Sequence, residues 1–316
     1  MITARGISVC LVLAALATGT LSDVPRQNPT IVLGGYRVLA ADFHVHSFPL
    51  SWATLGPVDT VLEARRQGLD VVAMTGHNHV WVAKVGRWFS QLTGGPRVLV
   101  GEEIVAPSYH LLAVGIDGPI SWKQSAASAI DEVHRQGGVA IAAHPVSFYW
   151  RAYDANAVSK LDGAEVLHPI AYFRAGAYQE LQQFYGRTRL TAIGDSDYHG
   201  LGAMGLCRTF VFARDDSAGS ILEAVRTQHT VVFDRDGQAF GDPNLIYLAR
   251  QNRQFVELRS LPSDMGILSR ASRAAGIIGL LGIFLFDSGR HGRMARPKRS
   301  AAQSVENDAA GNKASS

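Results

Sequence analysis

Cysteine is nearly absent from this chain of 316 residues, which contains only Cys10 and Cys207. Cys10 lies in an apolar run near the N-terminus, so a chain processed in that region would keep Cys207 alone. A fold built on several disulfides is therefore excluded, and so is a structural zinc site made of thiolates. Any metal site in this chain has to use histidine nitrogens and carboxylate oxygens.

A strongly basic surface is also lacking. The net charge is +3, but five basic residues lie in one C-terminal tail, so the chain without them has a net charge of −2. With 47% hydrophobic and 18% charged residues, the chain is typical of globular proteins and can form one large α/β domain or two smaller ones. An extended nucleic-acid-binding surface is not expected. The tail residues are Arg290, Arg293, Arg296, Lys298 and Arg299.

The N-terminal apolar run is shorter than a comfortable membrane span. It extends over residues 7–17, follows Arg5 and precedes a polar stretch. This pattern predicts a signal peptide or N-terminal anchor over residues 1–22, and a buried N-terminal helix is the alternative. We therefore expect an exported protein, periplasmic or otherwise extracytoplasmic.

A second apolar run lies near the C-terminus, over residues 274–286. The segment 266–288 predicts a membrane anchor if Arg270 and Arg273 reach the interface, or else an amphipathic or buried helix. Membrane association through the termini is therefore an open alternative. The last stretch, 289–316, is basic and then small and polar, as is typical of a disordered tail.

Between these ends, short β-branched runs alternate with helical patterns. One helix is predicted to start at Pro57 and to end before Gly68. Strands that are apolar on both faces, with helices between them, predict a parallel sheet covered by helices, either open or closed into a barrel. The predicted strands are 36–40, 69–75, 97–101, 109–116, 139–143, 163–167, 190–194 and 209–213.

Histidines and carboxylates follow the predicted strands, just past their carboxyl ends. In α/β folds this edge of the sheet is where functional sites are built. One such histidine is more often an ordinary loop residue, but five strands that each deliver a ligand type to one edge predict a metal site. The residues are His44, His46, His77, Glu103, His144, Asp197 and His199.

The spacing favours a cluster of ions. His44 and His46 are two residues apart in an extended segment, so both side chains point the same way. Nitrogen and oxygen ligands suit zinc, manganese or iron. More than six ligands exceed the needs of one tetrahedral ion, so we expect two or three divalent ions with Glu103 as a bridge. Asp42 is interpreted as a partner of the ligands.

The residues resemble the PHP (polymerase and histidinol phosphatase) superfamily, and its small stand-alone phosphoesterases in particular. The match begins near Ala40, ends near Phe233 and keeps the family's motif order. Histidine pairs and A-H-P are weak signals alone, whereas the ordered set is a specific one. The motifs are "DFHVHS" (42–47), "TGH" (75–77), "GEEI" (101–104), "YHLLAVGI" (109–116), "AHP" (143–145) and "GDSDYHG" (194–200).

The resemblance implies a distorted (β/α)7-type barrel over residues 30–260, with a two- or three-metal cluster at the strand carboxyl ends. It also implies hydrolysis of a phosphoester, a small phosphomonoester or a short phosphodiester end, by metal-activated water. Glu103, Asp197 and His199 are the expected catalytic residues. The implied metal ligands are His44, His46, His77, Glu103, His110, His144, Asp197 and His199.

Two positions depart from the family pattern. Trp52 stands where the family usually has a ligand, and Gly76 replaces the Asp of T-D-H. His79 is a candidate substitute ligand or a loop side chain, and His168 is a candidate ligand, substrate-binding residue or plain loop residue.

Three functions stay open at this stage. Arg151 and Arg174 are candidate phosphate clamps, because guanidinium binds phosphate through two bonds. The phosphoesterase is the first function. The alternatives are an amidohydrolase-like metal hydrolase, for which no lysine stands at a strand end, and a non-catalytic metal-binding envelope protein with a degraded site.

Overall fold

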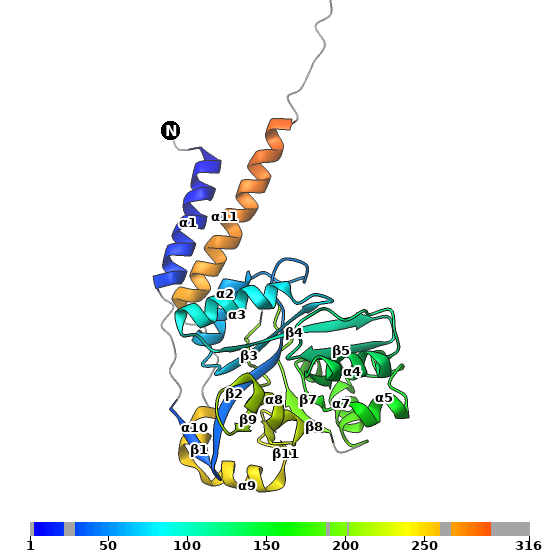
Figure 1. Ribbon diagram of the computed structural model, residues 1–316. Coiled ribbons are helices and arrows are strands. Elements are labelled where there is room, and N and C mark those ends of the chain that lie inside the picture. Colours follow the sequence, from blue (N-terminus) through cyan, green and yellow to red (C-terminus); the bar gives the residue numbers. More distant parts are fainter. Residues whose placement is uncertain (1–2, 22–28, 188–189, 201, 260–266, 292–316) are drawn as a thin grey trace, which may run out of the picture. The chain divides into compact units, whose positions relative to one another are not determined.

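The computed structural model describes residues 3–21, 29–187, 190–200, 202–259 and 267–291 (Figure 1). The chain forms two compact units: residues 1–22 with 265–316, and residues 23–264. Every candidate site residue lies in the second unit. The part of the expected tail over residues 292–316 lies outside the described residues.

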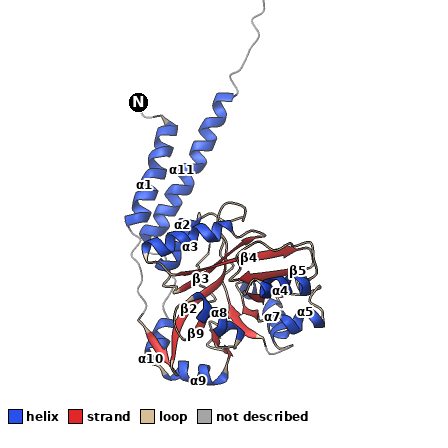
Figure 2. Cartoon of the chain, in the orientation of Figure 1, coloured by secondary structure: helices blue, strands red, loops and turns tan. Residues whose placement is uncertain are grey.

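The larger unit is built on one mixed sheet (Figure 2). Its strand order is β11-β10-β9-β2-β3-β4-β5-β6-β7-β8, and β1 pairs with β2. The two ends of the sheet approach each other: the Thr230 hydroxyl in β10 donates a hydrogen bond to the Ala192 carbonyl in β8. This nearly closed sheet confirms the predicted α/β barrel. The strands are β1 (Ile31–Leu33), β2 (Tyr36–Val45), β3 (Val71–His77), β4 (Arg97–Ala106), β5 (Tyr109–Val114), β6 (Val139–Ala142), β7 (Gly163–Leu167), β8 (Thr191–Gly194), β9 (Thr209–Ala213), β10 (Thr230–Phe233) and β11 (Ala239–Gly241).

The expected all-parallel sheet is wrong in part. β2, β3 and β4 pair in parallel, as do β6, β7 and β8, but β5 is antiparallel to both of its neighbours and β9 is antiparallel to β2. The reason is local, since only Pro107 and Ser108 separate β4 from β5. Two residues close a hairpin, whereas a parallel crossover needs a dozen or more.

Helices cover the sheet and begin at recognisable caps. The side chains of Ser125, Asp154 and Ser217 accept hydrogen bonds from the first turns of α4, α5 and α8, and Pro57 opens α2 as predicted. Figure 1 shows α2 and α3 together along β3 and β4. The helices of this unit are α2 (Pro57–Arg66), α3 (Trp81–Thr93), α4 (Ala126–Arg135), α5 (Ala155–Lys160), α6 (Ile170–Phe173), α7 (Ala177–Tyr185), α8 (Ala218–Arg226), α9 (Pro243–Gln251) and α10 (Arg253–Arg259).

The barrel interior is apolar and follows the two-residue period of the strands. Leu39, Ala41 and Phe43 of β2 belong to one buried cluster, while Val38 and Ala40 belong to a second cluster that includes residues of the covering helices. Ile221 of α8 joins the first cluster. Both faces of β2 are therefore buried, which explains its nearly continuous apolar sequence.

The smaller unit pairs α1 (Ala4–Leu21) with α11 (Ile267–His291). The Ser272 hydroxyl donates to the Ala15 carbonyl over 2.5 Å. A Cβ on Gly279 would lie 2.8 Å from the Ser8 carbonyl oxygen, so the glycine permits close approach of the two backbones. Within the described residues, no helix combines the length and apolar character needed to cross a membrane.

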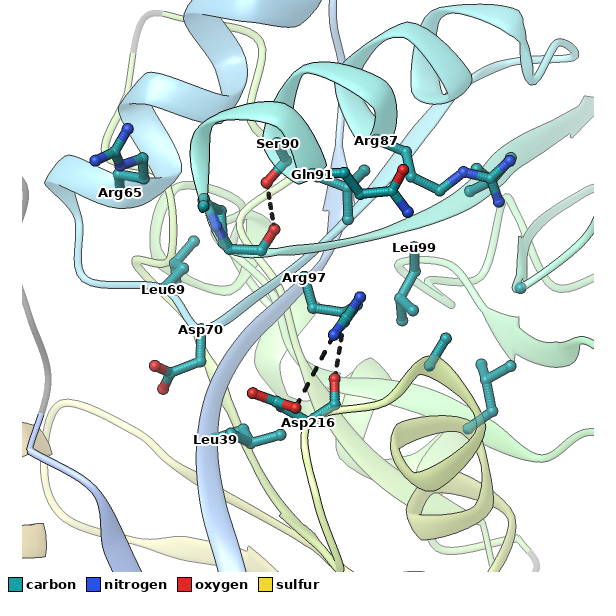
Figure 3. Close-up of a pocket in the computed structure, with 18 of the residues that line it drawn as sticks. Leu39, Arg65, Leu69, Asp70, Arg87, Ser90, Gln91, Arg97, Leu99 and Asp216 are labelled. Carbon is teal, nitrogen blue, oxygen red and sulfur yellow. Dashed lines mark hydrogen bonds and ion pairs between the residues drawn. The ribbon is translucent and has the colours of Figure 1, made fainter.

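Two cavities lie at opposite edges of the sheet. The larger, of about 770 Å³, adjoins Arg37 near the amino end of β2 and Arg97 at the amino end of β4. Figure 3 shows Arg97 among the residues that line it. The smaller, of about 210 Å³, adjoins His77 and Glu103 on the carboxyl-terminal side. Seven of the residues that the sequence singled out line the smaller cavity: His77, Glu103, His110, His144, His168, Asp197 and His199.

Candidate metal centre

Three parallel strands bring the first ligand candidates to one edge. His44 is the penultimate residue of β2 and His46 follows its end, while His77 ends β3. Glu103 lies in β4 directly opposite His77 in the strand register. His110 reaches the same edge from β5, because that strand is antiparallel and starts where β4 ends.

The remaining candidates follow β6 and β8. His144 comes two residues after β6, and Asp197 and His199 follow β8. The backbone of His144 has φ +24° and that of Asp197 has φ +45°, a region that residues other than glycine seldom adopt. Backbone strain of this kind persists where the surrounding structure imposes it, often at functional sites.

The ligand atoms of these residues face one another at short range. His46 Nε2 lies 3.0 Å from Asp197 Oδ1, and His44 Nε2 lies 3.3 Å from the same oxygen. On the other side, Glu103 Oε2 lies 3.4 Å from His44 Nε2 and 3.3 Å from His77 Nε2. The eight predicted ligands therefore form one cluster around two carboxylates.

This geometry fits divalent ions. Bonds of about 2.0–2.2 Å from an ion to nitrogen and oxygen place neighbouring ligand atoms about 3.0–3.5 Å apart. The observed separations fall in that range. Among the described residues, His44 Nε2, both ring nitrogens of His46 and Asp197 Oδ1 are buried and have no hydrogen-bond partner. Buried polar atoms without partners are costly, and a bound ion satisfies them.

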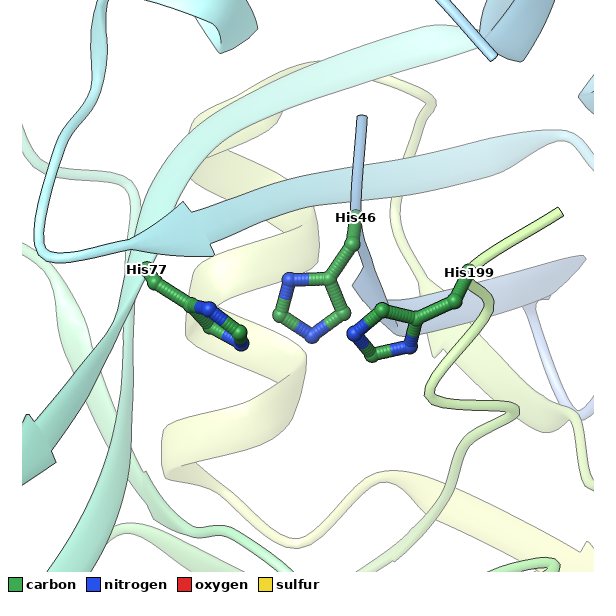
Figure 4. Close-up of side chains that lie close together, drawn as sticks. All are labelled: His46, His77 and His199. Carbon is green, nitrogen blue, oxygen red and sulfur yellow. The ribbon is translucent and has the colours of Figure 1, made fainter. Parts of the chain in front are cut away.

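Four overlapping groups of three residues have ligand atoms within 4.8 Å of one another. Figure 4 shows one of them, in which the imidazoles of His46, His77 and His199 lie side by side. Sharing of residues between groups is the arrangement expected of a cluster of ions. The other three groups are His44–Glu165–His168, His44–Glu103–His144 and His44–His46–Asp197.

The protonation states of His46 and Glu103 suit metal ligands. Burial lowers the pKa of His46 to about 4, so its ring is neutral near pH 7. Burial alone would raise the pKa of Glu103, but the charge of His44 and hydrogen bonds from His110 and His144 hold that pKa well below its usual value. The carboxylate is therefore ionised.

Two of the histidines are oriented through Nδ1. His44 Nδ1 lies 2.7 Å from Glu165 Oε1, and His199 Nδ1 lies 2.9 Å from the Asp197 carbonyl oxygen. Since both partners are acceptors, each Nδ1 carries a proton, which leaves Nε2 as the atom available to an ion. Burial lowers the pKa of His44, but the charges of Asp197, Glu165 and Glu103 outweigh it and hold that pKa well above 6.5, so His44 Nε2 loses a proton when an ion binds. Glu165 was missed in the sequence because it lies inside β7 and not after it. The sequence did carry a signal for Glu165, namely a carboxylate within the apolar run "GAEVL" (163–167). Because a buried charge is found almost only where it has a partner, such a residue is expected to pair with another polar group.

His168 is oriented in the opposite way. Its Nδ1 accepts a hydrogen bond from the Ile170 amide over 3.1 Å, so the proton of the neutral ring lies on Nε2. Nε2 points towards Asp197 Oδ2, 3.4 Å away. In this tautomer His168 is a hydrogen-bond donor at the cluster.

Asp42 is fully buried and binds backbone groups. It accepts hydrogen bonds from the amides of His44, Ser196 and Gly205 and from the Ser196 hydroxyl. Its carboxylate therefore fixes the loop that carries Asp197.

The two departures from the family pattern have structural explanations. Trp52 is 90% exposed and contributes nothing to the cluster, while its neighbour Ser51 accepts a hydrogen bond from the His77 amide. A Cβ on Gly76 would lie 2.5 Å from the His79 ring. The His79 imidazole thus occupies the space of the missing side chain, and His79 belongs to none of the four ligand groups.

The cavity at the cluster is small and has aromatic walls. Tyr149 packs on the His110 ring at 4.2 Å, and Phe173 lines the opening. Neither Arg151 nor Arg174 is among the described residues that line it. Arg174 pairs with Glu180 over 2.8 Å, and Arg151 lies over the Phe148 ring.

One protein related in sequence has no described function. The chain is 30% identical to the uncharacterised protein MJ1587 of Methanocaldococcus jannaschii over 154 residues, which cover 44% of this chain and 85% of that protein. No family model matches the chain.

One solved structure supports the fold, and a second is a weaker match. A two-domain protein of Bacteroides vulgatus that contains a predicted PHP-like metal-dependent phosphoesterase matches with a TM-score of 0.57 and 24% identity, over 74% of each chain. A protein of Bifidobacterium adolescentis to which metal-dependent phosphoesterase activity is attributed matches with a TM-score of 0.43 and 20% identity, over 59% of this chain and 94% of that one.

Proposed function

We propose that this chain, which belongs to one family with MJ1587 and to the PHP superfamily by its fold, is a metal-dependent hydrolase that acts on phosphoesters. The observation that carries the proposal is the set of buried, unpartnered ligand atoms around Glu103 and Asp197, separated by 3.0–3.4 Å. Such a set binds two or three ions better than it binds water or a neighbouring side chain.

The ligand candidates form three overlapping positions for ions. His44, His46 and Asp197 form one position, and His46 with His77 and His199 forms a second. His44, Glu103 and His144 offer a third. Bound zinc, manganese or iron supplies an activated water and neutralises phosphoryl charge.

The side chains around the cavity can donate a hydrogen bond to the substrate and can hold it in place. No lysine or arginine is found among the described residues that line the cavity, so neutralisation of a phosphate there depends on the ions. His168 carries its ring proton at Nε2 and lines the cavity, so it is placed to donate a hydrogen bond to a phosphoryl oxygen. Tyr149, Ile170 and Phe173 form an apolar wall for the group attached to the phosphate.

The cavity size supports a small substrate. At about 210 Å³ it is below the roughly 300–1,000 Å³ typical of ligand pockets. It accommodates a phosphoryl group, while the rest of the substrate stays outside against exposed side chains such as Phe173. A small phosphomonoester or the end of a short phosphodiester meets this condition.

The decisive experiment uses the full-length chain loaded with manganese or zinc and a generic aryl phosphate. The wild-type protein should release phosphate, and Asp197→Asn should reduce kcat by at least about a hundredfold, since it removes the carboxylate of one ion position. Asp215→Asn, at an exposed site, is the matched control.

The same assay separates the alternatives. Well-loaded protein that hydrolyses amides but no mono- or diester would show the amidohydrolase-like reaction. Stoichiometric metal without turnover of any ester or amide would show a metal-binding protein and refute the proposal.

We further propose that the chain is exported. The support is the sequence pattern of Arg5 followed by the apolar run, which forms α1. Cell fractionation with N-terminal sequencing of the recovered protein tests this. Recovery in the cytoplasmic fraction with an intact N-terminus would contradict it.

A further inference from the structure

The larger cavity is remote from the metal centre. It opens at the amino ends of β2 and β4, where Arg37 and Arg97 stand, whereas Glu103 lies six residues further along β4. At about 3.3 Å per residue this separates the two places by roughly 20 Å. With a volume of about 770 Å³, the cavity is in the normal range for small-molecule sites.

The charged residues in this cavity are unevenly paired. Four arginines and three aspartates line it. Asp216 serves two of the arginines: Arg37 NH1 lies 3.0 Å from Asp216 Oδ2, and Arg97 Nε donates to the Asp216 carbonyl over 2.8 Å. Figure 3 shows Arg97 and Asp216 joined in this way at the centre of the cavity.

The other two arginines have no such partner. Arg65 of α2 and Arg87 of α3 lie on either side of the Arg97–Asp216 pair (Figure 3). Within the part of the chain that the structure describes, neither guanidinium makes a hydrogen bond or an ion pair. Of the remaining aspartates, Asp70 accepts a hydrogen bond from the Ala40 amide and Asp117 is exposed. With four arginines against three aspartates, the lining has a net charge of +1 in a concave place, which attracts anions.

Apolar side chains lie between the charges. Leu39, Leu99 and Leu222 line the cavity. The rim loop at Gly95 is fixed, because the Ser90 hydroxyl donates to the Pro96 carbonyl over 2.5 Å. A preformed pocket with apolar walls and two separate guanidinium groups suits an organic molecule with at least two oxyanion groups.

We propose that this cavity is a second ligand site, which binds small organic polyanions carrying phosphate or carboxylate groups through Arg65 and Arg87. The site is independent of the reaction at the metal centre. Each guanidinium forms paired N–H···O bonds to one oxyanion group, and the carbon skeleton lies against the leucines. Because the interactions are ionic and partly exposed, binding weakens as the salt concentration rises.

Isothermal titration calorimetry on the full-length chain tests the proposal with two probes, pyrophosphate and tricarballylate. The two probes distinguish a phosphate ligand from a carboxylate one. The double variant Arg65→Gln/Arg87→Gln should lose at least about tenfold in affinity for the preferred probe, which corresponds to the loss of one strong interaction. Arg135→Gln/Arg250→Gln removes the same charge from exposed positions and should change the affinity little.

A variant of the metal centre, Asp197→Ala, distinguishes binding in the larger cavity from binding at the metal centre. In Asp197→Ala, the larger cavity should still bind pyrophosphate. The affinity for pyrophosphate should again fall when Arg65 and Arg87 are also replaced. Binding that disappears in Asp197→Ala and is unaffected by the two arginine substitutions would overturn the proposal. So would the absence of binding of either probe to the wild-type protein.

Chemical modification of the wild-type protein tests the same proposal without any substitution. Phenylglyoxal modifies accessible arginines, and peptide mass spectrometry reports the rate at each site. A bound probe should protect Arg65 and Arg87 and leave Arg135 unprotected. Equal modification rates of Arg65 and Arg87 with and without probe would contradict the proposal.

Discussion

Glu165 is buried in β7 and contacts two histidines of the candidate metal centre. Its carboxylate holds His44 Nδ1 at 2.7 Å and accepts a hydrogen bond from the His144 amide. Glu165→Gln should lower metal affinity by about 10- to 100-fold, because the charge that orients His44 and raises its basicity is lost. Metal titration by calorimetry measures this.

The matched control for Glu165 is Glu223→Gln, which changes a half-exposed carboxylate in α8. It should leave the metal affinity unchanged. An affinity of Glu165→Gln equal to that of the control would mean that His44 needs no orienting partner.

Gly76 and His79 form a second testable pair. Because a Cβ at position 76 would lie 2.5 Å from the His79 ring, Gly76→Ala should destabilise the protein by about 1–3 kcal/mol through overpacking. Adding His79→Ala should recover part of that loss, since the smaller side chain frees the space. Denaturant unfolding of the two single variants and the double variant measures the coupling. Strictly additive effects would show that the two positions do not compete.

At the scale of elements, the end of α4 is joined to the loop before β7. His134 Nε2 donates to Asp162 Oδ2 over 2.8 Å, and the same oxygen accepts from the Ala140 amide. The hydrogen bond to Asp162 raises the pKa of His134 above 6.5. The charged imidazole is therefore more stable in the folded protein than in the unfolded chain.

The sign of the resulting pH dependence follows from this shift. Stability from His134 is fully present below the unfolded pKa of 6.5 and is lost as the pH rises through the higher folded pKa. His134→Gln should cost about 0.2–1 kcal/mol at pH 5.5 and less at pH 9, because the pair is partly exposed. Urea unfolding of both proteins at the two pH values checks this. A cost that grows with pH would contradict it.

The elements also show why the sequence located most of the cluster. His77, His144 and Asp197 end strands or follow them, and residues at the same edge of a sheet converge wherever the strands lie in the barrel. Interior positions give no such signal, which is why Glu165 was missed. The direction of β5 came from the short turn at Pro107, which the assumption of strand–helix alternation had passed over.

At the scale of the whole molecule, the two units have separate interiors. The ligand candidates and the sheet lie within residues 23–264, which form their own buried core. A chain shortened to these residues should fold and bind the same number of metal ions as the full-length protein, since a domain with its own core can fold alone. Elemental analysis and near-ultraviolet circular dichroism measure both properties. Loss of the folded signal would show that α1 or α11 is needed for folding.

The sequence by itself determined the residue types and the chain order of the ligand candidates. Two residues in an extended segment share a face, and strand ends meet at one edge, so His44, His46 and His199 were predicted without coordinates. Tertiary structure alone decided the tautomer of His168, because it depends on the Ile170 amide. Tertiary structure alone also forms the larger cavity. Arg65, Arg87 and Asp216 line one cavity only because α2, α3 and α8 pack around the sheet. Local patterns specify what each side chain offers, whereas contacts between residues distant in the chain specify which atom faces which partner.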